Sequence, residues 1–185
     1  MGSDTQGYLE MAMLVSLGLL ILRVVVGLML AGHGAQKVFG WWGGPGMTGW
    51  TAIVTRLRIR PAAPWAWVAA LSELGGGILF ALGLLSPLGS LAIAGTMLVA
   101  VATVHWANGF WNTNRGYEFN LTILASVTAV ALAGPGTYSL DQALGLHLPE
   151  PITLLAATIA LVLGVGATLA FRSPKPAVEA KPQTT

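Results

Sequence analysis

The sequence predicts an all-α, polytopic membrane protein: a four-helix transmembrane bundle plus a fifth, C-terminal transmembrane helix. Of the 185 residues, 55% are hydrophobic and 9% are charged, and the mean hydropathy is +0.72. Soluble domains carry about 25% charged residues, so this chain has too few charges to cover a surface that faces water. It has no cysteine, which excludes disulfides, thiolate metal ligands and a catalytic thiol.

Five stretches are apolar enough to cross a bilayer, which takes about 20 residues. They cover residues 11–37, 64–85, 87–107, 117–133 and 151–171. The Ser86-Pro87 turn separates the second stretch from the third, and Gly134-Pro135-Gly136 ends the fourth, which is the shortest. We therefore expect a four-helix bundle over residues 11–150 and an additional transmembrane helix over residues 151–171.

The remaining segments are expected to lie outside the bilayer core. Residues 1–10 have no Lys or Arg, so they lack the basic start of a cleavable signal and should form an external tail. Residues 172–185 contain three prolines and should be a disordered tail. Residues 47–60 place Met47, Trp50 and Val54 at helical spacing before three arginines, which predicts a helix lying in the headgroup layer. The neighbouring tryptophans suit an interfacial belt or, alternatively, a gate beside a lipid-soluble ligand.

The basic residues predict the orientation. The N-terminus and the second and fourth loops contain no Lys or Arg, whereas the first loop, the third loop and the C-terminal tail contain all of them except Arg23. With five spans, these basic segments fall on one side of the membrane. The positive-inside rule then places the C-terminus in the cytoplasm and the N-terminus outside.

Arg23 lies in the middle of the first apolar stretch, where an arginine costs about 2.5–3.5 kcal/mol even on lenient insertion scales. It is roughly 11 residues, or about 16 Å, from the inner end of its span. Glu73 is the one acid of the second span. It is about nine residues from the inner end of that span, so its depth in the membrane should be similar to that of Arg23. We therefore expect a buried Arg23–Glu73 pair, which either fixes helix register or belongs to a functional site.

A second polar group is expected nearer the cytoplasmic face. His33 ends the first span, His105 ends the third and is followed by Asn108, and Glu118 begins the fourth. These side chains either line a polar pocket with Arg23 and Glu73 or touch interfacial water separately. Histidine and glutamate can exchange protons there. Two histidines on different spans could also ligate haem b, but both are at helix ends, and the sequence shows no haem, metal or nucleotide motif.

Four pieces of the sequence together resemble the DoxX family of small bacterial membrane proteins. They are "LRVVVGLMLAGHGAQKVFG", "LSELGGGILFALGLLSPL", "VHWANGFWNTNRGYEFNL" and "GPGTYSLDQAL", in family order over roughly residues 19 to 144. The resemblance implies a four-helix bundle in the bacterial plasma membrane. The family's polar positions correspond to Arg23, His33, Gln36, Lys37, Glu73, His105, Gly116, Glu118 and Asp141. Arg115 departs from the pattern, because a second small residue is more usual before Gly116.

The resemblance also implies a component of a membrane oxidoreductase, since members are associated with thiosulfate:quinone oxidoreductase. The function expected from it is a quinone-interacting membrane subunit of a redox complex, with lipids and other subunits as partners and no nucleic acid. Glu73, His105 and Glu118 would transfer protons in this hypothesis. The quinone would contact Arg23, His33, Gln36, Lys37 and Asn108.

The electron donor must be external, because the sequence shows no cofactor motif, so the chain is not expected to be an enzyme alone. Two alternatives stay open. The chain could be a structural or assembly subunit without chemistry, or a small-molecule or proton transporter, although no inverted repeat is evident.

Overall fold

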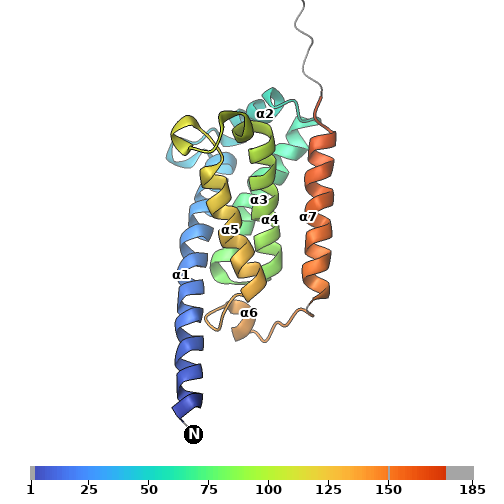
Figure 1. Cartoon of the computed structure of the whole chain (residues 1–185). Helices are drawn as coiled ribbons and strands as arrows, with labels where there is room; N and C mark the ends of the chain where they lie inside the picture. Colours follow the sequence, from blue (N-terminus) through green and yellow to red (C-terminus); the bar gives the residue numbers. More distant parts are fainter. Residues whose placement is uncertain (1–2, 150, 174–185) are drawn as a thin grey trace, which may run out of the picture.

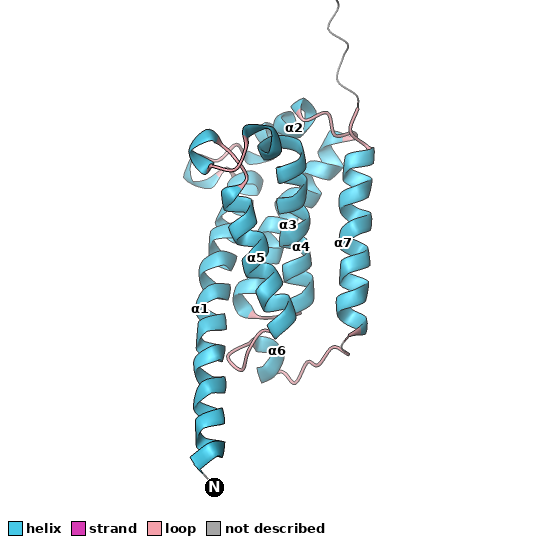
Figure 2. Ribbon diagram, viewed as in Figure 1, coloured by secondary structure: helices cyan, strands magenta, loops and turns pink. Residues whose placement is uncertain are grey.

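The computed structural model describes residues 3–149 and 151–173, and its long helices confirm the predicted all-α membrane architecture (Figures 1 and 2). The bundle helices are α1 (Ser3–Phe39), α3 (Ala62–Leu82), α4 (Ser86–Ala100) and α5 (Glu118–Ala133), and the additional helix is α7 (Ile152–Ala170). Four helical segments, among them α1, α3 and α7, are long and apolar enough to cross a membrane, and α5 is a shorter apolar helix. The chain is therefore a multi-pass membrane protein.

Short elements connect these helices. The 3-10 turn Trp41–Gly43 and α2 (Gly46–Arg56) link α1 to α3, and α6 (Leu140–Ala143) lies between α5 and α7. A π-helical turn (Val101–His105) extends α4, and 3-10 turns at Trp106–Asn108 and Asn112–Asn114 lead to α5. Helix α2 lies where the sequence predicts a helix within residues 47–60, and its position in the headgroup layer stays a prediction. Residues 3–10, which the sequence predicts to be a tail, form the first turns of α1, and the predicted tail of residues 174–185 lies outside the described residues.

The core lies between α1, α3, α4 and α5. Its fully buried side chains come from all four helices: Leu30, Phe80, Ile93, Ile123, Val127 and Val130. Each of these helices contributes apolar side chains at helical spacing, so four apolar faces meet at the centre of the bundle. Helix α7 stands beside α4 at the edge of the bundle (Figure 1), and Leu161 packs against the core from there.

Glycines let α3 approach both of its neighbours closely. A Cβ on Gly34 of α1 would lie 2.3 Å from the backbone nitrogen of Leu74, and one on Gly77 would lie 2.6 Å from that of Ala31. The preceding residue, Gly76, faces α4, where an added Cβ would lie 2.9 Å from the Cβ of Ala92. Because successive helical residues are 100° apart, Gly76 and Gly77 serve two different helix contacts, as small residues do in membranes.

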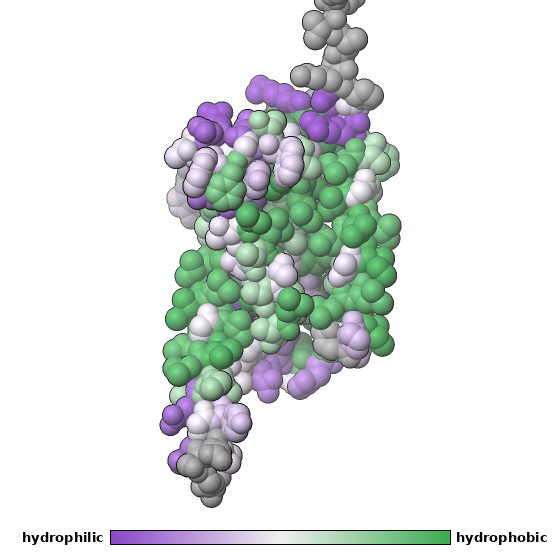
Figure 3. All heavy atoms as spheres, viewed as in Figure 1, coloured by the Kyte–Doolittle hydropathy of each residue, from purple (hydrophilic) through white to green (hydrophobic). Residues whose placement is uncertain are grey.

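The described arginines gather at one end of the bundle, except for Arg23. The linker after α2 pairs with the end of α7 at this end: Arg60 N–H donates to Phe171 O (3.0 Å), and Ser173 N–H donates to Arg58 O (2.9 Å). Figure 3 shows hydrophilic atoms at this end and a hydrophobic flank along the helices. The arrangement agrees with five crossings and puts the two ends of the described chain at opposite ends of the bundle (Figure 1). Which side of the membrane each end faces stays a prediction.

Candidate functional site

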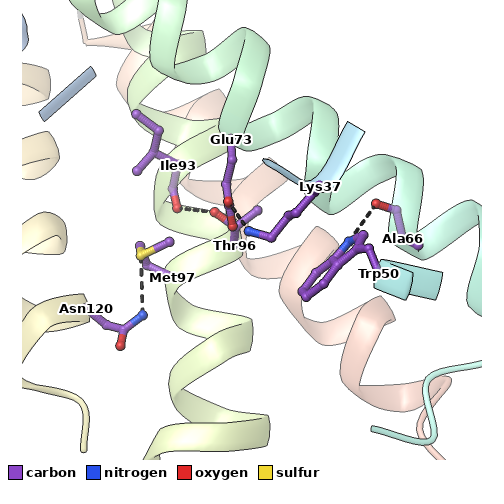
Figure 4. Close-up of polar contacts among 8 residues, drawn as sticks. All are labelled: Lys37, Trp50, Ala66, Glu73, Ile93, Thr96, Met97 and Asn120. Carbon is purple, nitrogen blue, oxygen red and sulfur yellow. Dashed lines mark hydrogen bonds and ion pairs between the residues drawn. The ribbon is translucent and has the colours of Figure 1, made fainter. Parts of the chain in front are cut away.

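Lys37 and Glu73 form a largely buried ion pair between α1 and α3 (Figure 4). The Glu73 side chain is 8% exposed and that of Lys37 is 15% exposed. The Lys37 ammonium also lies 4.7 Å from the centre of the Trp50 ring, in a cation–π contact. Trp50 is fixed in turn, because its indole N–H donates to Ala66 O (3.0 Å). Three elements, α1, α2 and α3, therefore hold one buried charge pair.

The predicted Arg23–Glu73 pair is wrong, because the antiparallel register of α1 and α3 separates the two residues. Gly27 faces Ala81 and Gly34 faces Leu74. Continued along both helices, this register places Ala35 opposite Glu73, whereas Arg23 lies twelve residues earlier. At 1.5 Å per residue the offset is about 18 Å. Lys37, which the sequence analysis names as a quinone contact but not as a partner of Glu73, forms the ion pair instead.

Arg23 is fully buried at the opposite end of the bundle, where it joins loops. Its guanidinium donates to Tyr138 O (2.8 Å) and Ala81 O (3.5 Å). Gly83, at the end of α3, leaves room for it, because a Cβ there would lie 1.9 Å from Arg23 Nη1. These contacts tie α1 to the turn after α3 and to the loop after α5.

Asp141 completes this cluster from α6. Its carboxylate accepts from the backbone N–H groups of Leu85 (2.8 Å) and Ser86 (2.9 Å), where α4 begins. A carboxylate at a helix N-terminus satisfies free N–H groups and is favoured by the helix dipole. Arg23 and Asp141 thus contact backbone groups. Both residues hold loops and helix ends together, which is a structural role.

An apolar cavity of about 240 Å³ lies between α2, α3, α4 and α7, and Glu73 is on its wall. Trp50 and Trp65 line it near α2, and Ser72, Thr96, Thr103 and Thr168 add hydroxyl groups. Helix α7 forms one side through Leu161, Gly164, Val165 and Thr168. Because Glu73 is the one charged side chain among the described residues of a mainly apolar lining, it is the group around which a bound ligand would be oriented.

The wall from α4 includes the π-helical turn. Thr103 and Val104 belong to this turn and line the cavity, and the Thr103 hydroxyl donates to Val99 O (2.7 Å). A π-turn inserts one residue into a helix and is frequent at functional sites. The sequence did not predict the π-helical turn or the contribution of α7 to the cavity. It left open whether tryptophans such as Trp65 form an interfacial belt or lie beside a ligand.

The second predicted polar group does not assemble into a pocket with Arg23 and Glu73. His105 Nδ1–H donates to Arg115 O (2.7 Å), and Asn108 donates to the same carbonyl (3.2 Å). Glu118 accepts from the backbone N–H of Asn112 (2.9 Å). All three side chains therefore bind the backbone of the loop that connects α4 to α5. These contacts indicate that the three residues hold this loop in position.

His33 and Gln36 also lie outside the cavity. His33 is exposed and its ring meets Phe119 edge-on, with centroids 6.4 Å apart. Gln36 packs against Gly44, where a Cβ would lie 2.5 Å from Gln36 Cβ. Of the eight predicted site residues, Glu73 lines the cavity and Lys37 reaches it through the ion pair. Among the described residues, no cluster of three or more His, Asp or Glu is arranged to hold a metal ion.

Comparison with protein families identifies the segment that carries the ion pair. Residues 18–106 match the family model described as DoxX. These residues belong to the DoxX family. The DoxX segment includes Lys37, Glu73 and the cavity walls from α2, α3 and α4, whereas α5 and α7 follow it. No curated protein and no solved structure matches the chain.

Proposed function

We propose that this DoxX protein is a quinone-interacting subunit of a membrane redox complex, and that the quinone head group binds in the cavity beside Lys37 and Glu73. The observation that carries the proposal is the Lys37–Glu73 ion pair, whose Glu73 lies on the wall of a mainly apolar cavity. An intramembrane charge is costly and is retained at functional sites. In this proposal the basic end of the bundle faces the cytoplasm, as the positive-inside rule requires.

The size and lining of the cavity suit a small ring with an apolar tail. Its volume of about 240 Å³ is just below the range of about 300–1,000 Å³ typical of drug-sized ligands. A single-ring head group can therefore fill the cavity while its tail remains in lipid. The side of the cavity formed by α7 is the expected entrance, because α4 is the one long helix against which the described part of α7 packs extensively.

Lys37 and Glu73 have the chemistry that a quinone requires. Reduction of a quinone to a quinol takes up two electrons and two protons, and the carbonyl oxygens become hydroxyl groups. The Lys37 ammonium is a hydrogen-bond donor for a carbonyl oxygen, and the Glu73 carboxylate is a proton acceptor when a quinol is oxidised. The electrons pass to or from a partner subunit, because this proposal assigns no redox group to the chain itself.

The test is an equilibrium titration of the purified protein with a soluble quinone analogue, using two variants of α7. Gly164 lines the cavity and has open space at its Cβ position, so Gly164→Leu adds a large side chain at the cavity wall and its Cβ meets no neighbouring atom. Gly166 has the same open space but does not line the cavity, so Gly166→Leu is the matched control. We expect Gly164→Leu to raise the Kd at least tenfold, or about 1.4 kcal/mol, and Gly166→Leu to leave it unchanged. Equal affinity in all three proteins would refute this location.

A structural or assembly role is the second candidate, and the free end of α1 favours it. Ser16 contacts the loop after α5, where Thr137 N–H donates to its hydroxyl (3.3 Å), and the residues before Ser16 extend past the bundle (Figure 1). This extension exposes large apolar side chains, including Met11 (63%) and Leu14 (67%). Exposed apolar helix surface of this kind suits a second membrane subunit. This role predicts that the protein assembles with its partner subunit and that this assembly does not depend on quinone.

A further inference from the structure

Four arginines lie where the linker between α2 and α3 meets the end of α7. Arg56 ends α2, Arg58 and Arg60 lie in the linker, and Arg172 follows α7. The side chain of Arg172 crosses to the linker, where Nε–H donates to Leu57 O (3.1 Å), and Ile59 and Arg172 form a backbone bridge. With the two backbone bonds described above, these contacts hold the linker and the end of α7 together. The four arginines are termed the arginine cluster below.

The arginine cluster is uncompensated within the part of the chain that the structure describes. The single salt bridge there joins Lys37 to Glu73, so none of the four arginines pairs with a carboxylate. Arg58 Nη1 is buried and has no hydrogen-bond partner among residues 3–149 and 151–173. A buried guanidinium donor normally finds an acceptor, so an anion with free oxygens is the natural partner. Arginine is the side chain that best matches phosphate oxygens, through two parallel N–H donors.

The surroundings of the cluster are apolar on the bilayer side. Helix α7 exposes most of its apolar side chains, among them Ile159, Val162 and Leu163. Trp65 of α3 lies 6.1 Å from Phe171 of the α7 end, between ring centroids, just inside the cluster. A group of hydrophilic atoms therefore caps a hydrophobic flank at this end (Figure 3). This combination fits a molecule that carries a phosphate and acyl chains.

We propose that the arginine cluster is a binding site for the phosphate of an anionic phospholipid, whose acyl chains lie along the lipid-facing surface of α7. Positive charge complements the anionic headgroup, and basic pockets between membrane helices are known to recognise such lipids. The fifth helix then has a role of its own, since it supplies Arg172 and the apolar surface. This inference does not depend on quinone binding in the cavity.

The experiment measures lipid binding by the delipidated, full-length protein in detergent. Phosphatidylglycerol and phosphatidylcholine with identical acyl chains are titrated separately, and inorganic phosphate is the third ligand. We expect phosphatidylglycerol to bind at least tenfold more tightly than phosphatidylcholine, and inorganic phosphate at equal concentration not to displace it. The preference should shrink as salt is raised from about 0.1 M to 1 M, because salt screens exposed charges.

Variants locate the site. The triple variant R58Q/R60Q/R172Q should lose the preference for phosphatidylglycerol, and Arg60→Gln alone, at an exposed side chain, should reduce it if the triple variant does not fold. Arg115→Gln is the matched control, because Arg115 is exposed in the other loop at the same end. Equal binding of the two lipids by the parent protein would overturn the proposal. So would a preference that survives in the cluster variants, or full displacement by inorganic phosphate, which would indicate a site for the free anion.

Discussion

Glu73→Ala is expected to lower the free energy of unfolding by about 3–5 kcal/mol, the usual cost of removing one partner from a buried ion pair. The variant leaves the Lys37 ammonium beside the Trp50 ring without its counter-ion. Glu73→Gln should cost less, because its amide oxygen can still accept a hydrogen bond from Lys37. Unfolding of the purified protein by heat or denaturant measures both effects.

A double-mutant cycle identifies the partner of Glu73. Lys37→Met combined with Glu73→Ala should recover part of the loss, since the double variant buries no unpaired charge. Arg23→Ala combined with Glu73→Ala should be additive within about 0.5 kcal/mol, because these residues share no contact. Additive costs for the Lys37 cycle, or strong coupling in the Arg23 cycle, would contradict the register of α1 and α3.

Gly34→Ala is expected to have the second large effect on stability. The added Cβ would lie 2.3 Å from the backbone nitrogen of Leu74, which cannot rotate away as a side chain can. Helices α1 and α3 must therefore separate, at a cost of about 1–3 kcal/mol or more for overpacking. The separation should also weaken the Lys37–Glu73 pair, which lies beside this contact.

Gly32→Ala is the matched control for this substitution, because nothing lies within 4 Å of its Cβ position on the same helix. Alanine there should be neutral or stabilising, by up to about 1 kcal/mol of helix propensity. Thermal unfolding of both variants under identical detergent conditions compares them directly. If Gly34→Ala is as stable as Gly32→Ala, the close approach of α1 and α3 is wrong.

The helices were predictable because their signals are local. The apolar length of each span, the Ser86-Pro87 turn and Gly134 gave the order and the approximate bounds of α1, α3, α4, α5 and α7. The short amphipathic helix α2 was also predicted, since Trp50 and Val54 share one face. The start of α1 was predicted less well, because residues 3–10 continue the helix although they are more polar.

The partner of Glu73 was not predictable in the same way, because it depends on how two helices slide along each other. Counting residues from the inner end of each span assumes that the spans end at one level. In the structure α1 continues to Phe39, and the close contacts at Gly27 and Gly34 set a register that brings Lys37 to Glu73. The glycines were visible in the sequence, but the residues that they face were not.

The hydrogen-bond partner of His105 was not predictable for a different reason. The π-turn that ends at His105 and the compact loop after it direct His105 to the carbonyl of Arg115. Arg115 itself has left-handed backbone (φ 62), a conformation that glycine adopts more easily than a residue with a side chain. These backbone features cannot be read from apolar length or residue type.

The location of bound quinone tests the central proposal most directly. An azido-quinone activated by light in membranes that contain the protein, followed by identification of the labelled peptides, shows where the head group lies. We expect labels on cavity residues of α2, α3, α4 and α7, such as Trp50, Trp65 and Val165, and we expect excess unmodified quinone to suppress them. Labels confined to the surface around His33 and Phe119, or labels that excess quinone does not suppress, would contradict a quinone site beside Lys37 and Glu73.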